Sequence, residues 1–190
     1  VLHKRLGLGR DCIVYDVNLN CSGYIFGLHT ACSLMQCSSA TRALVLVADT
    51  TCKGVSPLDR NRLLFGCAGA ATLVEKTDTA PRMLFGLKSD GSRFKTIITA
   101  AGAFRNRNAS RERETWFDGN IRSDYDVFIN GADVFSFTMT DVPRLFEEFL
   151  QHYQLGTDEF DCLLLHQANL WIMKRIARKL KIPVEKMPVS

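Results

Sequence analysis

Apolar residues occur along the chain in short continuous runs that are typical of strands. Four of these runs predict strands, at residues 12–20, 43–49, 63–74 and 161–165, and the first of them is rich in β-branched and aromatic side chains. Two further strands are predicted at 82–88 and 94–99, because a Ser-Asp-Gly turn separates them. The run at 43–49 is apolar up to its final aspartate, which indicates a strand that is buried on both faces.

Longer apolar stretches alternate with these runs and have the spacing of helices. They predict helices at residues 22–37, 131–155 and 168–180. We expect Pro143 to kink or split the second helix, because proline removes a backbone hydrogen bond. The polar segment at 102–124 is interpreted as a long exposed loop. Strands that alternate with helices predict an α/β fold.

The composition is close to that of soluble globular proteins. Apolar residues make up 46% and charged residues 23% of the 190 residues. No segment approaches the ~18 continuous apolar residues of a membrane span. The N-terminal residues are not followed by the apolar core of a signal peptide. We therefore expect a cytoplasmic protein with no membrane partner.

The seven cysteines are an odd number, and none belongs to a Cys-x-x-Cys pair. Most lie within apolar runs, where a thiol behaves as a small buried hydrophobic group. We expect a reducing compartment rather than a framework of disulfides. Cysteine, histidine and aspartate also lack the spacing of a ligand set, so no metal site is predicted.

The formal net charge of +4 permits attraction of acidic partners but does not demonstrate it. One segment is basic enough to be considered as a nucleic-acid-binding patch. It contains the arginines at 105–113 and Arg122. Only Trp116 adds an aromatic ring to them, and Glu112 and Glu114 dilute their charge. A solvated loop is the preferred interpretation, and no nucleic-acid partner is predicted.

Cys21 is the first candidate for chemistry. It follows the predicted strand at 12–20 and precedes a predicted helix that contains Gly23 and Gly27. A thiol at a helix N-terminus lies at the positive end of the helix dipole, which favours the thiolate. The thiolate is the nucleophile that thioester exchange requires. A buried structural cysteine is the alternative for this residue alone.

His166 is the second candidate. It ends the predicted strand at 161–165 and begins the sequence His-Gln-Ala-Asn. A histidine at such a junction can donate a hydrogen bond to a thioester oxygen or stabilise an enolate. A partly buried histidine with satisfied hydrogen bonds is the alternative.

Taken together, these segments resemble the nucleophile and histidine motifs of the type III ketoacyl-acyl-carrier-protein synthases, which have the thiolase fold. The resemblance follows the family order along almost the whole chain. The matching segments lie at residues 16–28, 44–49, 59–70, 130–135 and 165–169. The sequence His-Gln-Ala-Asn favours this type over chalcone-type synthases, hydroxymethylglutaryl-CoA synthases and thiolases.

The resemblance implies a layered αβαβα fold that is incomplete in this chain. Residues 1–75 would belong to the N-terminal half, which carries the nucleophile, and residues 76–190 to the C-terminal half, which carries the histidine. The family's third catalytic residue is an asparagine in a Gly-Asn-Thr-Ser-like motif, which is absent here, as is a portion ahead of the nucleophile strand. We therefore expect a fragment that is inactive alone and belongs to a homodimeric enzyme.

The resemblance also implies the reaction. Cys21 would accept an acyl group from acyl-CoA, and malonyl-acyl carrier protein would lose carbon dioxide to give an enolate that attacks the acyl-cysteine. His166 would stabilise the enolate and the oxyanion, and the backbone amide of Cys21 would form part of an oxyanion hole. The product would be a 3-oxoacyl-acyl carrier protein, formed with acyl-CoA as a substrate and without a cofactor.

Three further residues stand at family positions that are associated with the acyl donor. They are Arg60, at a position near the CoA nucleotide, for which a solvated loop arginine is the alternative; Ala132, which departs from an asparagine that often contacts pantetheine; and Asn169, in the histidine motif. Two other residues also depart from the family pattern. Cys67 replaces a usual aspartate, and Trp171 replaces an arginine that is thought to help dock the carrier protein, so the identity of the donor stays open.

Two other functions remain open at this point. One is a non-decarboxylating transfer of the acyl group from Cys21 to an amine or alcohol, since a fold does not fix a reaction. The other is a non-catalytic partner subunit, although a partner of this kind commonly loses its nucleophile.

Overall fold

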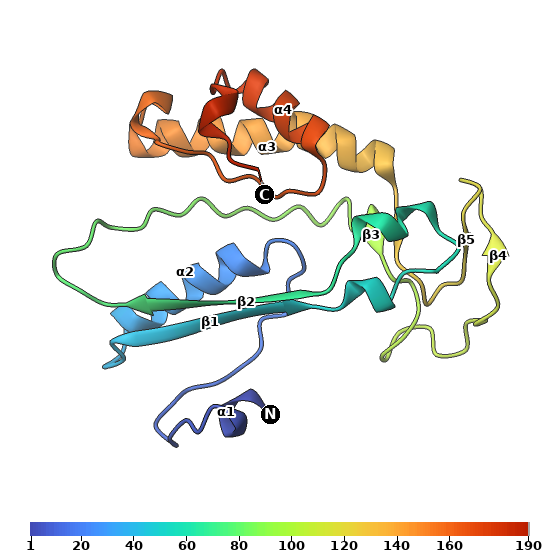
Figure 1. Ribbon diagram of the computed structural model, residues 1–190, viewed down its shortest axis with the longest axis horizontal. Helices are drawn as coiled ribbons and strands as arrows, with labels where there is room; N and C mark the ends of the chain where they lie inside the picture. Colours follow the sequence, from blue (N-terminus) through green and yellow to red (C-terminus); the bar gives the residue numbers. More distant parts are fainter. Residues whose placement is uncertain (190) are drawn as a thin grey trace. The chain divides into compact units, whose positions relative to one another are not determined.

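The computed structural model describes residues 1–189, and Ser190 lies outside the described residues (Figure 1). Two compact units can be distinguished. The first consists of residues 1–47 and 70–81, and the second of residues 48–69 and 82–189. Each unit is described by itself. The predicted division into two thiolase-type halves near residue 75 stays a prediction.

The first unit is built from α2 (Gly23–Gln36) on the paired strands β1 (Arg42–Asp49) and β2 (Ala68–Glu75), and it also contains α1 (Leu2–Arg5). Arg42 at the start of β1 forms an ion pair with Glu75 at the end of β2. The two strands are therefore antiparallel. The helix buries Ala31 and Met35 against strand side chains, among them Val45 and Val74. The predicted helix at 22–37 and strand at 43–49 are confirmed, but the expected burial of the strand on both faces is wrong, because Leu44 and Leu46 are exposed and Val45 is buried.

Several predicted strands are absent from the described residues. Residues 12–20, 82–88 and 161–165 are not strands, although their apolar composition favoured this. A strand is defined by pairing with a neighbour, and composition does not supply the pairing. The prediction at 63–74 is only partly confirmed, because a 3₁₀ helix, η2 (Arg60–Leu64), precedes β2. The prediction at 94–99 corresponds to the two-residue strand β3 (Ile97–Ile98).

The second unit is centred on α3 (Gly131–Tyr153) and α4 (Leu170–Lys179), which pack together (Figure 1). Ile176, Leu180 and Ile182 form a buried cluster against Met139, Val142 and Phe146 of α3. Both helices were predicted from apolar residues that recur at helical spacing, and both are confirmed. Three further 3₁₀ helices are η1 (Thr51–Lys53), η3 (Thr157–Glu159) and η4 (Val184–Lys186).

The expectation was that Pro143 would kink or split the helix, and the structure shows that it does not split it. α3 continues through Pro143, which is buried. Proline has no N–H to donate, so it leaves the carbonyl of Met139 without its usual helical donor. Lys179 Nζ of α4 donates to this carbonyl at 2.6 Å. A side chain of the neighbouring helix thus satisfies the acceptor that the proline leaves exposed.

The interpretation of 102–124 as a long exposed loop is also corrected. This segment contains an antiparallel hairpin of β4 (Glu114–Thr115) and β5 (Ile121–Arg122), in which Glu114 faces Arg122. The turn uses Gly119 at a φ of +76°, a conformation that favours glycine. A second small ladder joins β3 to β6 (Phe128–Ile129).

A disulfide joins Cys52 and Cys67, which are 15 residues apart. The sequence analysis did not predict this pair, and the other five cysteines are thiols, so a framework of disulfides is not present in the described residues. Neither the spacing of the two residues nor a Cys-x-x-Cys motif marks them as a pair. None of the helices in residues 1–189 is both long and apolar enough to cross a membrane.

Candidate active site

Cys21 lies directly before α2. Ser22 is the N-cap residue, and the N–H of Gly23 donates to the carbonyl of Asn20 at 2.8 Å. The Cys21 side chain is exposed. The first turn of α2 has no acidic residue and no side-chain cap. Its N–H groups therefore place the positive end of the helix dipole next to Cys21.

A close contact between α2 and β1 fixes the direction of the helix that follows Cys21. A Cβ atom added at Gly27 would lie 3.0 Å from Val45 Cγ1, so a larger residue would require the Val45 side chain to shift by a few tenths of an ångström. On the same unit, the hydroxyl groups of Tyr24 and Thr72 lie 3.2 Å apart. Glycine at position 27 therefore has a packing role that supports the position of Cys21.

His166 lies shortly before α4 and is exposed. Asn169 is the N-cap residue of this helix, and its Oδ1 accepts a hydrogen bond from the N–H of Ile172 at 3.1 Å. The amide of Asn169 thus has a structural role that the sequence did not indicate, and it fixes the chain next to the histidine. A direct contact of Asn169 with an acyl donor stays a prediction.

Cys21 belongs to the first compact unit and His166 to the second. Each residue lies just ahead of a helix, as the sequence predicted. Their catalytic roles stay predictions. No cluster of three metal-ligating side chains occurs within residues 1–189.

The segments of Arg60 and Ala132 meet at one pocket of about 220 Å³ in the second unit. Arg60 begins η2 and Ala132 is the second residue of α3, and both are exposed. Their sequence neighbours Asn61 and Gly131 line the pocket. The structure therefore brings together two of the predicted donor-binding segments, although neither Arg60 nor Ala132 itself lines the pocket.

The β4–β5 hairpin supplies the other side of this pocket, through Phe117, Asp118 and Asn120. Sequence reasoning missed these residues because it treated the segment as a solvated loop. The dipeptide Asp118-Gly119 between strand-like residues is a hairpin signal that could have identified them. Burial alone would raise the pKa of Asp118, but hydrogen bonds from Asn120 and Arg122 outweigh it and keep the pKa below its usual value. Asp118 is therefore an anion at neutral pH.

Trp171, which departs from the family pattern, lies in a stack of three side chains. Its ring lies 5.5 Å from the ring of Phe135 of α3, centre to centre, and the Arg175 guanidinium carbon lies 4.3 Å from its ring centre. The Trp171 side chain is 53% exposed. A cation is thus retained on this surface at Arg175, four residues from the position where the family has arginine.

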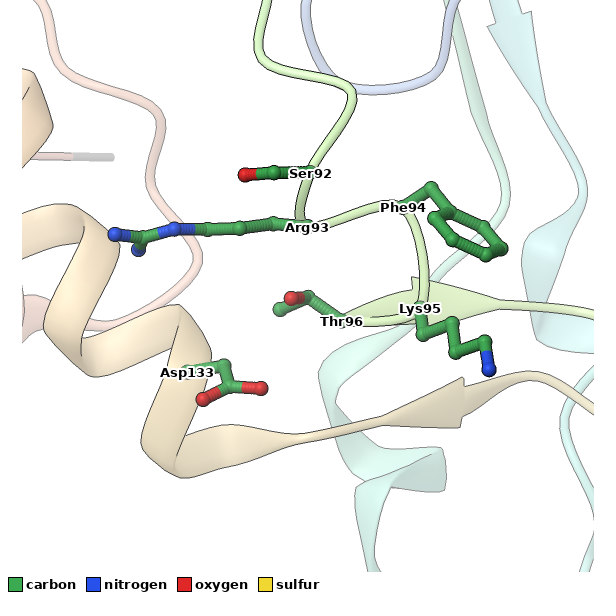
Figure 2. A pocket seen from close by; sticks show the side chains of 6 residues that line it. All are labelled: Ser92, Arg93, Phe94, Lys95, Thr96 and Asp133. Atoms are coloured by element: carbon green, nitrogen blue, oxygen red, sulfur yellow. The ribbon is translucent and has the colours of Figure 1, made fainter.

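A second, larger pocket of about 390 Å³ lies beside the start of α3 (Figure 2). It is lined by residues 92–96 and by Asp133, and Figure 2 shows the Arg93 side chain directed toward α3. The Arg93 guanidinium forms an ion pair with Asp141, in which its Nη2 lies 3.3 Å from Asp141 Oδ2. This pocket is open and has a mixed polar and apolar lining, and no predicted site residue lines it.

Comparisons with known proteins agree with this architecture. A sequence model of the family 3-oxoacyl-[acyl-carrier-protein (ACP)] synthase III matches residues 15–91. A putative 3-oxoacyl-[acyl-carrier-protein] synthase 3 of Campylobacter jejuni is 30% identical over 98% of this chain. A beta-ketoacyl-[acyl-carrier-protein] synthase III of Prochlorococcus marinus is 33% identical over the same share.

Solved structures give the same result. The crystal structure of a 3-oxoacyl-(acyl-carrier-protein) synthase III has a TM-score of 0.94 and 35% identity over 99% of this chain. The Burkholderia xenovorans 3-oxoacyl-(acyl-carrier protein) synthase has a TM-score of 0.85 and 33% identity over 100% of it. The chain therefore has the architecture of the thiolase-type α/β enzymes. Within that class it is related to the 3-oxoacyl-acyl-carrier-protein synthase III family, which confirms the predicted resemblance.

The chain spans about half the length of the relatives that it matches. It covers 53% of the Campylobacter protein, 54% of the Prochlorococcus protein and 57% of the first solved structure. The resemblance thus extends over nearly all of this chain but only part of each relative.

Proposed function

We propose that the protein containing this chain is a condensing enzyme that joins an acyl group from acyl-CoA to malonyl-acyl carrier protein. The observation that carries the proposal is the position of Cys21, directly before a helix whose first turn has no acidic residue and no side-chain cap. This position favours the nucleophilic thiolate. Family resemblance over almost the whole chain supplies the reaction class.

The reaction proceeds in two half-reactions. The Cys21 thiolate attacks the thioester carbonyl of acyl-CoA, and the CoA thiolate leaves, so that the acyl group is bonded to Cys21. Malonyl-acyl carrier protein then loses carbon dioxide, and the resulting enolate attacks the acyl-cysteine carbonyl. The new carbon–carbon bond displaces the Cys21 thiolate and gives the 3-oxoacyl product.

His166 acts on the oxygen atoms that gain negative charge. A ring N–H of His166 donates a hydrogen bond to the thioester oxygen of the malonyl group as the enolate forms. The backbone N–H of Cys21 donates to the oxyanion of the tetrahedral intermediate. Both donors belong to segments that a following helix orients, α4 for His166 and α2 for Cys21.

Arg60, Ala132 and Asn169 form the proposed donor-binding segments. The Arg60 cation attracts the phosphates of CoA. Asn61, which follows Arg60, and Gly131, which precedes Ala132, line the same pocket. Ala132 contacts the pantetheine chain of the donor. The reaction needs no cofactor in addition to its two substrates. We place the enzyme in the cytoplasm as a homodimer, by analogy with the family.

Intact-protein mass spectrometry of the full-length protein tests this function. After incubation with a panel of acyl-CoAs, we expect a mass gain of one acyl group that is absent from Cys21→Ala. Cys37→Ala is the matched control, because Cys37 is exposed at the opposite, negative end of α2. Labelled malonyl-acyl carrier protein then separates condensation, which releases labelled carbon dioxide, from acyl transfer to an amine or alcohol. Retention of the acyl adduct in Cys21→Ala would contradict the proposal.

A further inference from the structure

Arg122 is fully buried although it carries a charge. Its Nε lies 3.1 Å from Asp59 Oδ2, and a second ion pair joins its Nη2 to Asp118. The guanidinium carbon lies 5.1 Å from the ring centre of Trp116 and 5.2 Å from that of Phe128. Two carboxylates and two aromatic rings therefore fix this side chain.

The contact with Asp59 connects Arg122 to the turn that begins with Arg60. Asp59 is the N-cap residue of η2, and its Oδ1 accepts a hydrogen bond from the N–H of Asn61 at 2.7 Å. Arg122 contacts the other oxygen of the same carboxylate. The position of the guanidinium therefore determines how the carboxylate caps the turn.

Two more hydrogen bonds join the hairpin to the same segment. Asn120 Oδ1 accepts from the N–H of Arg60 at 3.1 Å, and Ser56 Oγ donates to the carbonyl of Ile121 at 2.6 Å. Arg60 directly follows Asp59, and Ile121 directly precedes Arg122. The other two residues lie within three positions of Asp59 or Arg122. The hairpin and residues 56–61 thus form one connected network, and Asn61 and Asn120 line the same pocket.

This network is costly if its purpose is stability alone. Burial of an ion pair loses solvation energy, and well-packed apolar residues of similar volume are often as stabilising. Among residues 1–189, Arg122 Nε, Arg122 Nη1 and Asp59 Oδ2 are moreover buried without a hydrogen bond, so that Nε and Oδ2 interact as an ion pair only. A buried donor without a partner is unfavourable. The planar, always charged guanidinium instead provides a fixed geometry, which is what a binding segment needs.

We propose that Arg122 is a positioning residue for the acyl donor: through Asp59 it fixes the turn that presents Arg60 and Asn61 to the nucleotide portion of acyl-CoA. The inference deepens the proposed function and rests on it for the identity of the ligand. Arg122 does not touch the substrate. It acts through the position of the segment that does.

The test uses the full-length protein and two variants. Arg122→Lys keeps the charge but loses the planar fork. The double variant Asp59→Asn with Arg122→Met removes both charges of the buried ion pair, because Arg122→Met alone would leave the Asp59 carboxylate buried without its cation. The side-chain oxygen of the introduced asparagine can still cap the turn. Arg113→Met is the matched control, because Arg113 precedes the same hairpin and pairs with Asp126 instead.

We expect both variants to raise the Kd of CoA in calorimetry, and the KM of acyl-CoA in loading of Cys21, on the order of tenfold or more. The maximal loading rate should stay within about twofold, because the nucleophile is unchanged. An acyl-pantetheine donor, which lacks the nucleotide, should load equally well in every variant. Arg113→Met should match the wild type. Thermal unfolding verifies that the double variant is folded.

The possible results separate the two proposals. Equal affinity for CoA in the wild type and both variants would overturn the positioning role, as would a matching loss with the acyl-pantetheine donor, which would indicate general structural damage. A wild-type protein that binds CoA, with the expected weakening in the variants, but never acquires an acyl group would support the positioning role and refute the proposed reaction. A wild-type protein that binds no CoA would refute the positioning role directly.

Discussion

The buried side chains that support the segment of Cys21 and those that support the segment of Arg60 differ in chemistry. We call these two sets the apolar support and the polar support. Behind Cys21, α2 packs on β1 and β2 through apolar side chains, with Ala31 and Met35 buried at the centre. Behind Arg60, the buried side chains are polar or charged, and the central one is Arg122. The first segment carries the proposed nucleophile, and the second carries the proposed donor-binding turn.

This difference determines how each segment responds to change. An apolar interior is densely packed, so it responds to a change in side-chain volume and hardly to pH. A buried polar network responds to the removal of a charge or of one hydrogen-bond partner, because each unpaired group is costly in a medium of low polarity. The apolar support can therefore be destabilised by a change in side-chain volume, and the polar support by the removal of a charge.

The largest expected effect comes from the apolar support. Met35→Ala leaves a cavity where a side chain only 5% exposed is packed, and it should lower the free energy of unfolding by about 2–5 kcal/mol. Urea unfolding should give the same loss at pH 5 and pH 7, since the side chains buried with Met35 are apolar. Met35→Leu, which nearly conserves the volume, should cost less than about 1.5 kcal/mol. A loss that changes strongly between these two pH values would contradict the comparison.

The two supports also differ in how well the sequence predicts them. The helix at 22–37 and the strand at 43–49 were predicted because their apolar residues identify what each element buries. The network around Arg122 was not predicted, because an arginine in a polar segment is normally exposed. Its burial depends on Asp59, which lies more than sixty positions earlier in the chain, and one sequence alone does not indicate such a pairing.

The other errors have similar causes. The segments at 12–20 and 161–165 have strand-like composition, but pairing defines a strand and composition does not provide it. α3 continues through Pro143 because Lys179 of another helix satisfies the carbonyl that proline leaves without a donor. In each case the deciding partner is distant in sequence. The motifs around Cys21 and His166 were recognised because they are local.

The disulfide gives the second prediction, which concerns the polar support. Cys52 and Cys67 close a loop that contains Ser56, Asp59 and Arg60. A cross-link over this 15-residue separation limits the unfolded chain, and its loss should lower the free energy of unfolding by about 3 kcal/mol. We expect the Cys52→Ser, Cys67→Ser double variant to unfold at lower urea than the oxidised wild type.

The control for the disulfide is the reduced wild-type protein. With a dithiol reductant present, the wild type and the double variant should unfold at the same urea concentration, because the reductant converts the disulfide to two thiols. Alkylation followed by mass spectrometry reports the oxidation state of the two residues in the folded protein. Alkylation of both thiols without a reductant would show that the cross-link is absent.

The smallest expected effect is a pH dependence in the polar region. Burial alone would raise the pKa of Asp126, but hydrogen bonds from Arg113 and Ser123 outweigh it and keep the pKa below its usual value. A lowered pKa contributes stability that is complete above the unfolded-state value of about 3.9 and is lost as the pH falls through the folded-state value. Arg113→Met removes two of these hydrogen bonds. The pKa of Asp126 should rise toward its usual value, and acid unfolding should begin at a higher pH.

The shift should be modest, because the Arg113 side chain is 42% exposed and solvent screens its charge. Acid titration followed by circular dichroism measures it, and NMR of the Asp126 carboxyl measures the pKa directly. In Asp126→Asn the titrating group is gone, so Arg113→Met should no longer move the acid transition. If Arg113→Met moved that transition equally in both backgrounds, the pH dependence would come from a carboxylate other than Asp126, and the assigned role of the Arg113–Asp126 pair would be wrong.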